Sequence, residues 1–490
     1  MLFNSYEFIF LFLPITVAIY YLLNRWRMPI ASNAWILFAS LFFYGWWNIK
    51  YIPLLLGSIL FNYTIGSLLS DFNINKKNLI SKKSIFVFGV VTNILLLGYF
   101  KYSDFFIANL NTIAGLNINY LKVVLPLGIS FFTITQLAFL VDCYEGLVTE
   151  RKLLNYALFV TFFPHLLAGP ILHHKEMMPQ FDRLRNKVIN YRNLSIGCYL
   201  FFIGLFKKII IADGFAQIVA SGFDKTTSLN FIEGWVTSLS YMMQIYYDFS
   251  GYSDMAVGIG LLFNIVLPWN FNSPYKSVNI IEFWKRWHIT LANFITTYLY
   301  TPILRATGSI TFSRSLLAIF IAMIISGIWH GAGWTFILWG ACHGVALVVN
   351  HYWRRKRIFM PKFLAWLLTF LFINFTFVIF RAKDIHRAYN VFKSMLGAGV
   401  PVLGGGLDKI TLSDFTHGYL WKALLINIQG RDATFTTLLV VLVFTFATKN
   451  SIYLANTFKP DWKRFVFLLA ITMYSLLNMG KVTEFLYFQF

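Results

Sequence analysis

The chain has 490 residues, of which 58% are hydrophobic, 19% aromatic and only 12% charged. A soluble globular domain is typically about a quarter charged, so this composition excludes a soluble protein, and its apolar content excludes a disordered one. Three cysteines are too few for a small disulfide scaffold. We predict an all-α polytopic membrane protein, because the apolar runs are continuous and do not alternate as they do in an outer-membrane barrel.

The charge balance is strongly basic, with 41 Lys and Arg against 20 Asp and Glu, a net charge of +21. In a soluble protein this excess would indicate nucleic-acid binding. Here the basic residues lie in short loops between apolar runs, which is typical of positive-inside topology and of contact with anionic membrane lipid. We therefore predict lipid contact and no nucleic-acid partner.

The first apolar run, 8–23, is followed by Arg25 and Arg27 and has no positive charge before it. This order is the reverse of a signal peptide, so we expect an uncleaved helix whose N-terminus lies outside. A membrane-crossing helix needs about 20 residues, and the run 315–349 is long enough for two short passes, or for one long helix and a re-entrant piece. We predict about 11 or 12 transmembrane helices plus re-entrant or interfacial ones. The apolar runs are 8–23, 34–47, 52–69, 85–99, 121–141, 154–172, 194–220, 231–266, 315–349, 363–380, 434–447 and 465–477.

The run 154–172 is unusual because it begins and ends at basic loops and contains Pro164, Gly169 and Pro170. Proline and glycine break helices, so we predict a re-entrant segment beside a protein-lined cavity. Three histidines flank it, but no HExxH or CxxC spacing supports a metal, and we predict none. These histidines are His165, His173 and His174.

The remaining organisation is simple. We predict one transmembrane domain over 1–490, with an active-site core at about 121–350 and an outer-face segment of mixed polarity at about 381–432. The basic loops at 76–83, 150–152, 183–192, 276–286, 353–357 and 449–464 are expected to be cytoplasmic.

Two carboxylates, Asp248 and Asp254, lie inside the apolar run 231–266, together with Ser250, Gly251 and Tyr252. An ionisable residue inside a membrane span is a functional candidate, because its burial is costly. One interpretation is a bent helix whose carboxylates cap a break or pair with a nearby Arg. The other is a cavity lined by carboxylates that orient a catalytic base.

A second cluster follows at 282–288. The spacing of Trp284, Trp287 and His288 places them on one face of a helix. An interfacial amphipathic helix explains Lys285 and Arg286 at headgroup level, but leaves His288 on the aromatic face unexplained. We therefore treat His288 as a candidate functional residue.

The third cluster surrounds His330, which lies among glycines in a long apolar stretch with Trp329 and Trp334 beside it. Imidazole is the usual general base near neutral pH; the alternative is a buried histidine bonded to a carbonyl. His343 is thirteen residues further on, more than three turns away on an ideal helix, so we do not group it with His330. No phosphate-binding loop, dinucleotide fingerprint or GxSxG elbow is present.

Together these motifs carry a family resemblance. The segments YDFSGYSD at 247–254, FWKRWH at 283–288 and WHG at 329–331 resemble the membrane-bound O-acyltransferase (MBOAT) family. PLGISFF at 126–132, FFPHLLAGPI at 162–171, NFNSPY at 270–275 and FLYF at 485–488 are similar to its bacterial AlgI/PatA-like branch, with the DltB type more distant. The likeness covers essentially the whole chain.

The resemblance implies an O-acyltransferase in the bacterial inner membrane, with His330 as the catalytic histidine and His288 as a second active-site histidine. It implies a cytoplasmic acyl donor, acetyl-CoA or another acyl thioester, which is a substrate and not a permanently bound cofactor. The acetyl group would cross the membrane through a tunnel and pass to a periplasmic SGNH-hydrolase-type partner. The product would be an O-acetylated cell-surface polysaccharide, such as an alginate-like exopolysaccharide, or peptidoglycan.

The chemistry of these residues agrees with that implication. His330 can take the hydroxyl proton, and a protonated His288 or a Trp indole N–H can support the oxyanion. Asp248 or Asp254 can fix the imidazole tautomer. The other candidate substrate-binding residues are Ser250, Tyr252, Trp284, Arg286, Trp287, Trp329 and Trp334.

Three alternatives remain open: D-alanyl transfer to teichoic acid from a carrier-protein thioester, a transporter or flippase in which these groups form a proton relay, and a lipid acyltransferase working within the bilayer.

Overall fold

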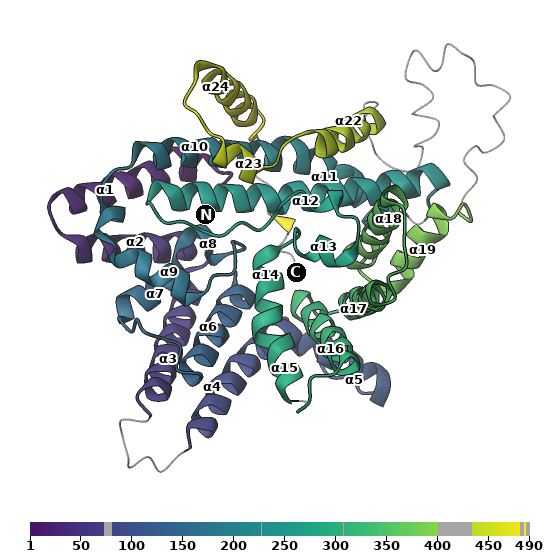
Figure 1. Ribbon diagram of the computed structural model, residues 1–490, viewed down its shortest axis with the longest axis horizontal. Coiled ribbons are helices and arrows are strands. Elements are labelled where there is room, and N and C mark those ends of the chain that lie inside the picture. The colour runs from purple at the N-terminus through teal and green to yellow at the C-terminus, as the bar shows by residue number, and fades with distance from the viewer. Residues whose placement is uncertain (73–80, 227, 307, 400–433, 481–484, 487–490) are drawn as a thin grey trace. The chain divides into compact units, whose positions relative to one another are not determined.

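The computed structural model describes residues 1–72, 81–226, 228–306, 308–399, 434–480 and 485–486 (Figure 1). Over these residues the chain forms helices and no β-strand, which confirms the predicted all-α class. The chain divides into two compact units. Unit 1 comprises 1–205, 252–269 and 455–490, and unit 2 comprises 206–251 and 270–454. Each unit is described by itself.

Unit 1 contains helices within the predicted apolar runs and others between those runs. They are η1 (Phe8–Phe12), α1 (Leu13–Arg25), α2 (Pro29–Gly45), η2 (Ile49–Tyr51), α3 (Ile52–Ser70), α4 (Lys82–Leu97), η3 (Gly98–Tyr102), α5 (Ser103–Ala114), α6 (Ile129–Tyr144), α7 (Leu153–Thr161), α8 (Phe163–Leu166), α9 (His174–Asp182), η4 (Leu184–Lys187), α10 (Tyr191–Phe206) and α24 (Trp462–Leu477).

Unit 2 contains the two motif clusters that carry the candidate histidines His288 and His330. Its helices are η5 (Lys207–Ala212), α11 (Asp213–Ala220), η6 (Ser221–Lys225), η7 (Pro274–Lys276), α13 (Ile280–Trp284), α14 (Ile289–Phe294), η8 (Ile295–Tyr300), α15 (Thr301–Ala306), α16 (Phe312–His330), α17 (Trp334–Arg355), α18 (Lys362–Arg381), α19 (Ile385–Met395) and α22 (Thr434–Ala447). The helices α12 (Phe231–Leu262) and α23 (Ser451–Asn456) contribute to both units, as does α10 through its last residue.

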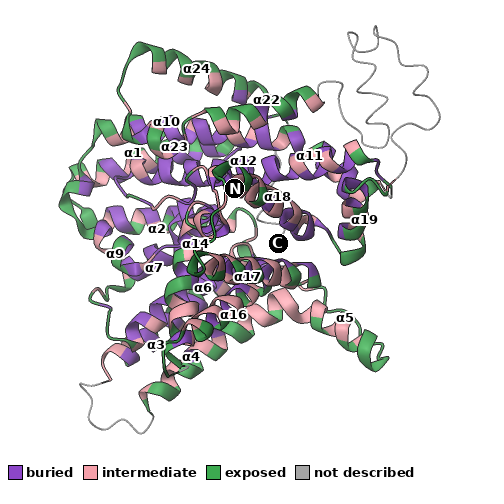
Figure 2. Cartoon of the chain, turned by 45° about the vertical axis from the view of Figure 1, so that its right-hand side comes forward, coloured by how far each residue is buried: buried purple, intermediate pink, exposed green. Residues whose placement is uncertain are grey.

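Six helical stretches among the described residues are long and apolar enough to cross a membrane: Phe8–Arg25, Ile49–Ser70, Lys82–Ala114, Tyr191–Lys225, Phe312–His330 and Lys362–Arg381. Three shorter apolar helices accompany them. Several helices also carry large apolar side chains on the outside, and α24 is largely exposed (Figure 2). Apolar exposure on this scale suits contact with lipid. The chain is a multi-pass membrane protein, and the predicted total of 11 or 12 passes stays a prediction.

The run 154–172 is broken as predicted. Helix α7 ends at Thr161, the four-residue α8 contains Pro164, and residues 167–173 are not helical. His174 then begins α9 and places its Nδ1 3.0 Å from Asp142 Oδ2, with both side chains buried. This contact with Asp142 gives the buried His174 a structural role.

One predicted helix begins later than expected, and one predicted segment lies largely outside the described residues. The predicted helix 121–141 starts only at Ile129, because Pro126 disfavours helix in the residue before it and Gly128 adopts φ +72°. Of the outer-face segment 381–432, α19 occupies the beginning, while residues 400–433 lie outside the described part of the chain.

Helices α16 and α17 form an antiparallel pair joined by residues 331–333. Glycines allow their backbones to meet: a Cβ placed on Gly327 would lie 2.4 Å from Phe336 O, and one on Gly340 would lie 2.5 Å from Met323 O. Small residues permit such close helix packing in membranes. The run 315–349 is therefore two helices, of which α16 is one of the candidate membrane spans.

Candidate active site

His330 is the last residue of α16 and lies in an aromatic enclosure. Its side chain is buried, and its ring centroid lies 5.0 Å from that of Trp329, 5.1 Å from Trp339 and 5.3 Å from Phe380. Gly331 is extended, with φ −165° and ψ 158°, and this ends the helix directly after the imidazole. The sequence predicted the apolar surroundings of His330 and its neighbour Trp329, but not Trp339.

The buried face of α17 brings a second histidine to the same region. Trp339 and His343 are four residues apart, their ring centroids are 4.6 Å apart, and His343 is fully buried. On one continuous helix His343 would lie more than three turns from His330. The reversal at 331–333 removes that separation, because Trp339 contacts both histidines.

Hydrogen bonds fix the His343 ring on both sides. Trp284 Nε1 donates to His343 Nδ1 over 3.2 Å, so the ring proton is on Nε2, which lies 3.1 Å from Thr376 Oγ1. That hydroxyl in turn donates to Ile373 O over 3.0 Å. Since each donor has an acceptor, this series of hydrogen bonds holds the His343 imidazole in one tautomer and one orientation. His343 is thus a positioning residue between α13, α17 and α18.

The predicted helical face of the second cluster is wrong. Helix α13 ends at Trp284, residues 285–287 form a turn, and His288 adopts φ 43° and ψ 55° before α14 begins. Trp284 therefore contacts His343, while Trp287 packs on Phe283 and His288 packs on Phe249, with centroids 5.7 and 4.7 Å apart. A left-handed conformation at a histidine is costly and is typical of functional sites.

Asn270 orients the His288 imidazole. His288 Nδ1 lies 3.2 Å from Asn270 Oδ1, and the same oxygen accepts hydrogen bonds from Thr290 N at 3.3 Å and Thr290 Oγ1 at 2.6 Å. A backbone N–H can only donate, so the Asn270 atom is the carbonyl oxygen and His288 Nδ1 carries the proton. The Nε2 lone pair is left as an acceptor. The group that orients His288 is therefore an amide.

His288 lies outside the helices that are candidates for membrane spans. Its burial lowers the pKa of the imidazole to about 3, because the cation loses its hydration. The ring is consequently neutral at physiological pH.

Asp248 lies on α12 and forms a buried ion pair. Lys208 Nζ is 2.8 Å from Asp248 Oδ1 and 2.8 Å from Asp213 Oδ1, and the Lys208 and Asp248 side chains are 2% and 3% exposed. The sequence analysis offered an Arg as one possible partner and did not identify Lys208, which is forty residues away along the chain. Such a pair fixes η5 against α12, because separating either charge would leave the other unpaired in a low dielectric.

The other candidate residues occupy varied positions. Ser250 is buried on α12, and in unit 1 Tyr252 packs between Phe3 and Phe485, with centroids 4.9 Å from each. Arg286 pairs with Glu282 at 2.8 Å. Trp334 is 56% exposed at the start of α17, and Asp254 is buried in unit 1.

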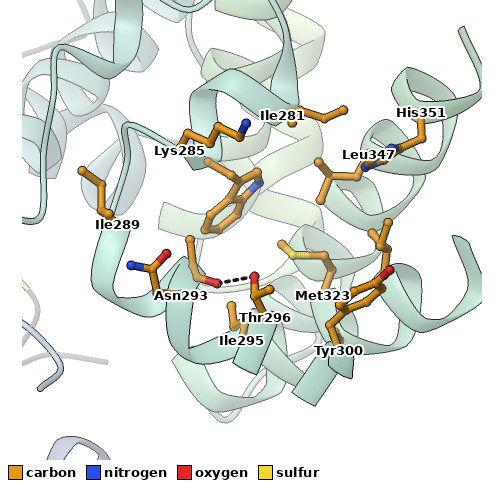
Figure 3. A pocket seen from close by; sticks show the side chains of 14 residues that line it. Ile281, Lys285, Ile289, Asn293, Ile295, Thr296, Tyr300, Met323, Leu347 and His351 are labelled. Atoms are coloured by element: carbon orange, nitrogen blue, oxygen red, sulfur yellow. Dashed lines mark hydrogen bonds between the residues drawn. The ribbon is translucent and has the colours of Figure 1, made fainter. Parts of the chain in front are cut away.

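A cavity of about 420 Å³ opens within unit 2 between α13, α14, η8, α16 and α17 (Figure 3). Most of its lining is apolar, including Met323 and Leu347. Lys285 and His351 lie at one end (Figure 3). Trp284, whose indole bonds to His343, forms part of the wall. Contacts from Trp284 to His343, and from His343 to Trp339, thus connect the cavity wall to the aromatic enclosure of His330.

The sequence did not identify several of these residues, and only one group of them follows a recognisable spacing. Thr335, Trp339, His343 and Leu347 recur every four residues, which is the spacing of a buried helix face. Lys208, Asn270 and Thr376 are distant in sequence from their partners, so no local pattern marks them.

The sequence resembles known proteins over its full length. Residues 41–383 match MBOAT, the membrane-bound O-acyltransferase family. The chain is 43% identical over its whole length to a peptidoglycan O-acetyltransferase of Helicobacter pylori, covering 98% of that protein. It is 37% identical to a probable alginate O-acetylase AlgI of Pseudomonas aeruginosa, with 87% of this chain and 80% of that protein aligned. A teichoic acid D-alanyltransferase of Bacillus subtilis is 28% identical over 53% of this chain and 70% of its own length.

The family match covers more than half of the chain, and the peptidoglycan and alginate relatives align with most of it. The chain belongs to the membrane-bound O-acyltransferase family and is an acyltransferase.

Proposed function

We propose that this enzyme transfers acetyl groups from a cytoplasmic acetyl-CoA donor to a hydroxyl acceptor across the membrane, for the O-acetylation of peptidoglycan or another cell-surface polysaccharide. The observation that carries this proposal is His330, buried in an aromatic enclosure and linked through Trp339 to Trp284, which walls the cavity. The whole-length similarity to a peptidoglycan O-acetyltransferase favours peptidoglycan as the acceptor.

The cavity suits an acyl thioester. Its apolar length can hold the acyl group and the alkyl part of a donor away from water, which protects the thioester from hydrolysis. Lys285 and His351 at one end can attract a phosphate-bearing donor (Figure 3). The basic loop 353–357 follows His351 directly and adds charge of the same sign.

The proposed transfer uses ordinary acyl chemistry. The acceptor hydroxyl oxygen attacks the carbonyl carbon while His330 takes its proton, and a tetrahedral oxyanion forms. When the carbonyl re-forms, the C–S bond breaks and His330 returns the proton to the leaving thiolate. His288 presents Nε2 as an acceptor, so it can receive a hydrogen bond from a second hydroxyl of the acceptor and orient the substrate.

We further propose that the enzyme lies in the bacterial inner membrane and passes the acetyl group to a periplasmic partner of the SGNH-hydrolase type. Support comes from the bacterial branch that the sequence motifs resemble. D-alanyl transfer to teichoic acid is the second candidate, and the 28% identical relative supports it over a smaller part of the chain.

The test uses membrane vesicles with the cytoplasmic face outward, labelled acetyl-CoA outside, and an SGNH-type partner with peptidoglycan fragments inside. We compare wild type, His330→Ala and His386→Ala; His386 is exposed on α19 and serves as the matched histidine control. We expect lumenal label with wild type and His386→Ala, and a loss of at least about 100-fold with His330→Ala, the usual effect of removing a general base.

Other results would count against the proposal. Equal labelling by His330→Ala would remove the histidine from the reaction. Wild-type activity with a D-alanyl carrier thioester, and none with acetyl-CoA, would replace the donor and favour the second candidate. Undiminished movement of unmodified substrate across the membrane in His330→Ala would indicate a transporter.

A further inference from the structure

The indole of Trp339 has an unusual hydrogen-bonding state. Trp339 is 2% exposed, and its Nε1–H has no acceptor among the residues that the structure describes. A buried tryptophan normally finds a partner for this group. Other indoles of this chain do so: Trp35, Trp235, Trp353 and Trp366 donate to backbone carbonyls, and Trp284 donates to His343.

The unpaired donor lies beside the proposed general base. The rings of Trp339 and His330 have centroids 5.1 Å apart and are nearly perpendicular, with an interplanar angle of 87°. At this separation a substrate oxygen can lie about 3 Å from the indole nitrogen while the attacking hydroxyl is within hydrogen-bond reach of His330.

The position of Trp339 is fixed by its neighbours. Its ring contacts His343 at 4.6 Å, Phe380 at 5.3 Å and Trp284 at 5.9 Å. His343 is itself held by hydrogen bonds from Trp284 and to Thr376. A donor held this way before the reaction need not reorganise during it, which is the condition for strong stabilisation of developing charge.

We propose that Trp339 is a catalytic residue whose indole N–H donates a hydrogen bond to the thioester carbonyl oxygen and to the oxyanion that replaces it. The assignment rests on the proposed function, since it requires an acyl thioester at His330. As the acceptor oxygen bonds to the carbonyl carbon, the C=O π pair moves onto that oxygen and Trp339 stabilises the charge. Collapse re-forms the double bond and expels the thiolate, which takes its proton from His330.

The alternative donor considered from the sequence, a protonated His288, fits the structure less well. His288 Nδ1 directs its proton to Asn270 Oδ1, and its Nε2 is the unprotonated nitrogen. His288 Nε2 is therefore an acceptor, whereas Trp339 offers a donor.

The first test compares the kinetics of Trp339→Phe and Trp366→Phe in the vesicle assay with acetyl-CoA. Phe keeps an aromatic ring and removes only the N–H and part of the bicycle. Trp366, on α18, is the matched control because its N–H donates to Tyr275 O. We expect kcat to fall about 100- to 1,000-fold in Trp339→Phe, as on loss of one oxyanion donor, with KM nearly unchanged. Trp366→Phe should retain kcat.

The second test separates charge stabilisation from packing. Two inert donor analogues are used as inhibitors: S-ethyl-CoA, which lacks the carbonyl, and a trifluoromethyl ketone analogue, which adopts a tetrahedral hydrated form. Trp339→Phe should weaken inhibition by the ketone analogue and leave inhibition by S-ethyl-CoA unchanged. A 3-benzothienylalanine at position 339, which keeps the bicyclic shape without the N–H, should behave in the same way if Trp339→Phe folds poorly.

The outcomes distinguish the two proposals. Wild-type kcat in the benzothienyl variant, or equal weakening of both inhibitors, would overturn the role of Trp339 while leaving the proposed function intact. A wild-type enzyme that transfers no acetyl group from acetyl-CoA would contradict the proposed function, and this assignment with it.

Discussion

Position 288 combines a neutral imidazole with a fixed tautomer. Burial lowers the pKa of His288 to about 3, and Asn270 Oδ1 accepts the Nδ1 proton. An amide stabilises that tautomer without adding charge, whereas a carboxylate in the same place would favour the imidazolium. The choice of amide therefore keeps Nε2 available as an acceptor over the whole physiological pH range.

Exchanging that amide for a carboxylate should shift the pH dependence of the reaction. In Asn270→Asp the new charge raises the pKa of His288, so the required neutral form, and with it the transfer rate, is lost as the pH falls through the raised value. At pH 8 the rate should match wild type. We would measure initial rates between pH 4 and 8, where wild type should show no inflection from His288.

Asn270→Leu serves as the comparison, because it removes the acceptor and leaves the Nδ1 proton and Thr290 unpaired. Its rate should fall about equally at every pH. Superimposable profiles for wild type and Asn270→Asp would show that His288 does not need to be neutral.

At the scale of elements, the α16–α17 pair depends on the absence of side chains where its helices meet. A Cβ on Gly340 would lie 2.5 Å from Met323 O, and backbone cannot move aside as a flexible side chain can. Separation of the helices at this point would also move Trp339, the residue that precedes Gly340, away from His330.

Adding one methyl group at a close-packed glycine and at an open one should therefore distinguish the effect of packing on stability from that of helix propensity. Gly340→Ala should lower the free energy of unfolding by about 1–3 kcal/mol, the usual effect of overpacking. Gly57→Ala on α3 has nothing within 4 Å of the added Cβ and should stabilise by about 0.5–1 kcal/mol through helix propensity. Thermal unfolding in detergent would measure both; equal shifts of the two melting temperatures would contradict close packing at Gly340.

The sequence predicted helices better than it predicted how helices meet. Apolar runs located α1, α3, α12 and α18 closely, because burial and lipid contact both select continuous hydrophobic sequence. Helix ends were less predictable: the break after Trp284 has no proline or glycine to mark it, and the reversal at 331–333 was only one of two possibilities. His330 and His288 could be chosen from their chemistry alone, whereas Trp339 gains its role from a contact that exists only after folding.

For the whole molecule, the direction of the reaction depends on which ends of the helices face the cytoplasm. Helix α18 has 20 residues, so at 1.5 Å per residue it spans about 30 Å, the thickness of the hydrocarbon layer. The loop 353–357 before it is rich in Arg and Lys. This asymmetry predicts that the end of α18 near Lys362 is cytoplasmic and that the end near Arg381 is outside.

Cysteine labelling checks that orientation. Lys356→Cys should react with a membrane-impermeant maleimide only when the cytoplasmic face is outward, and Lys383→Cys, at a residue 68% exposed at its side chain, only in the opposite orientation. The unmodified chain, which has Cys143, Cys198 and Cys342, gives the background. Labelling of both positions from the same side would contradict a crossing by α18.

The left-handed backbone at His288 has a consequence for how this sequence is constrained. Glycine adopts φ 43° and ψ 55° without the steric penalty that a Cβ brings, so a chain selected only for stability would place glycine there. The enzyme has an imidazole instead. Folding and catalysis thus favour different amino acids at this position. A substitution that stabilised the protein by relieving this backbone strain would remove one of its candidate active-site groups.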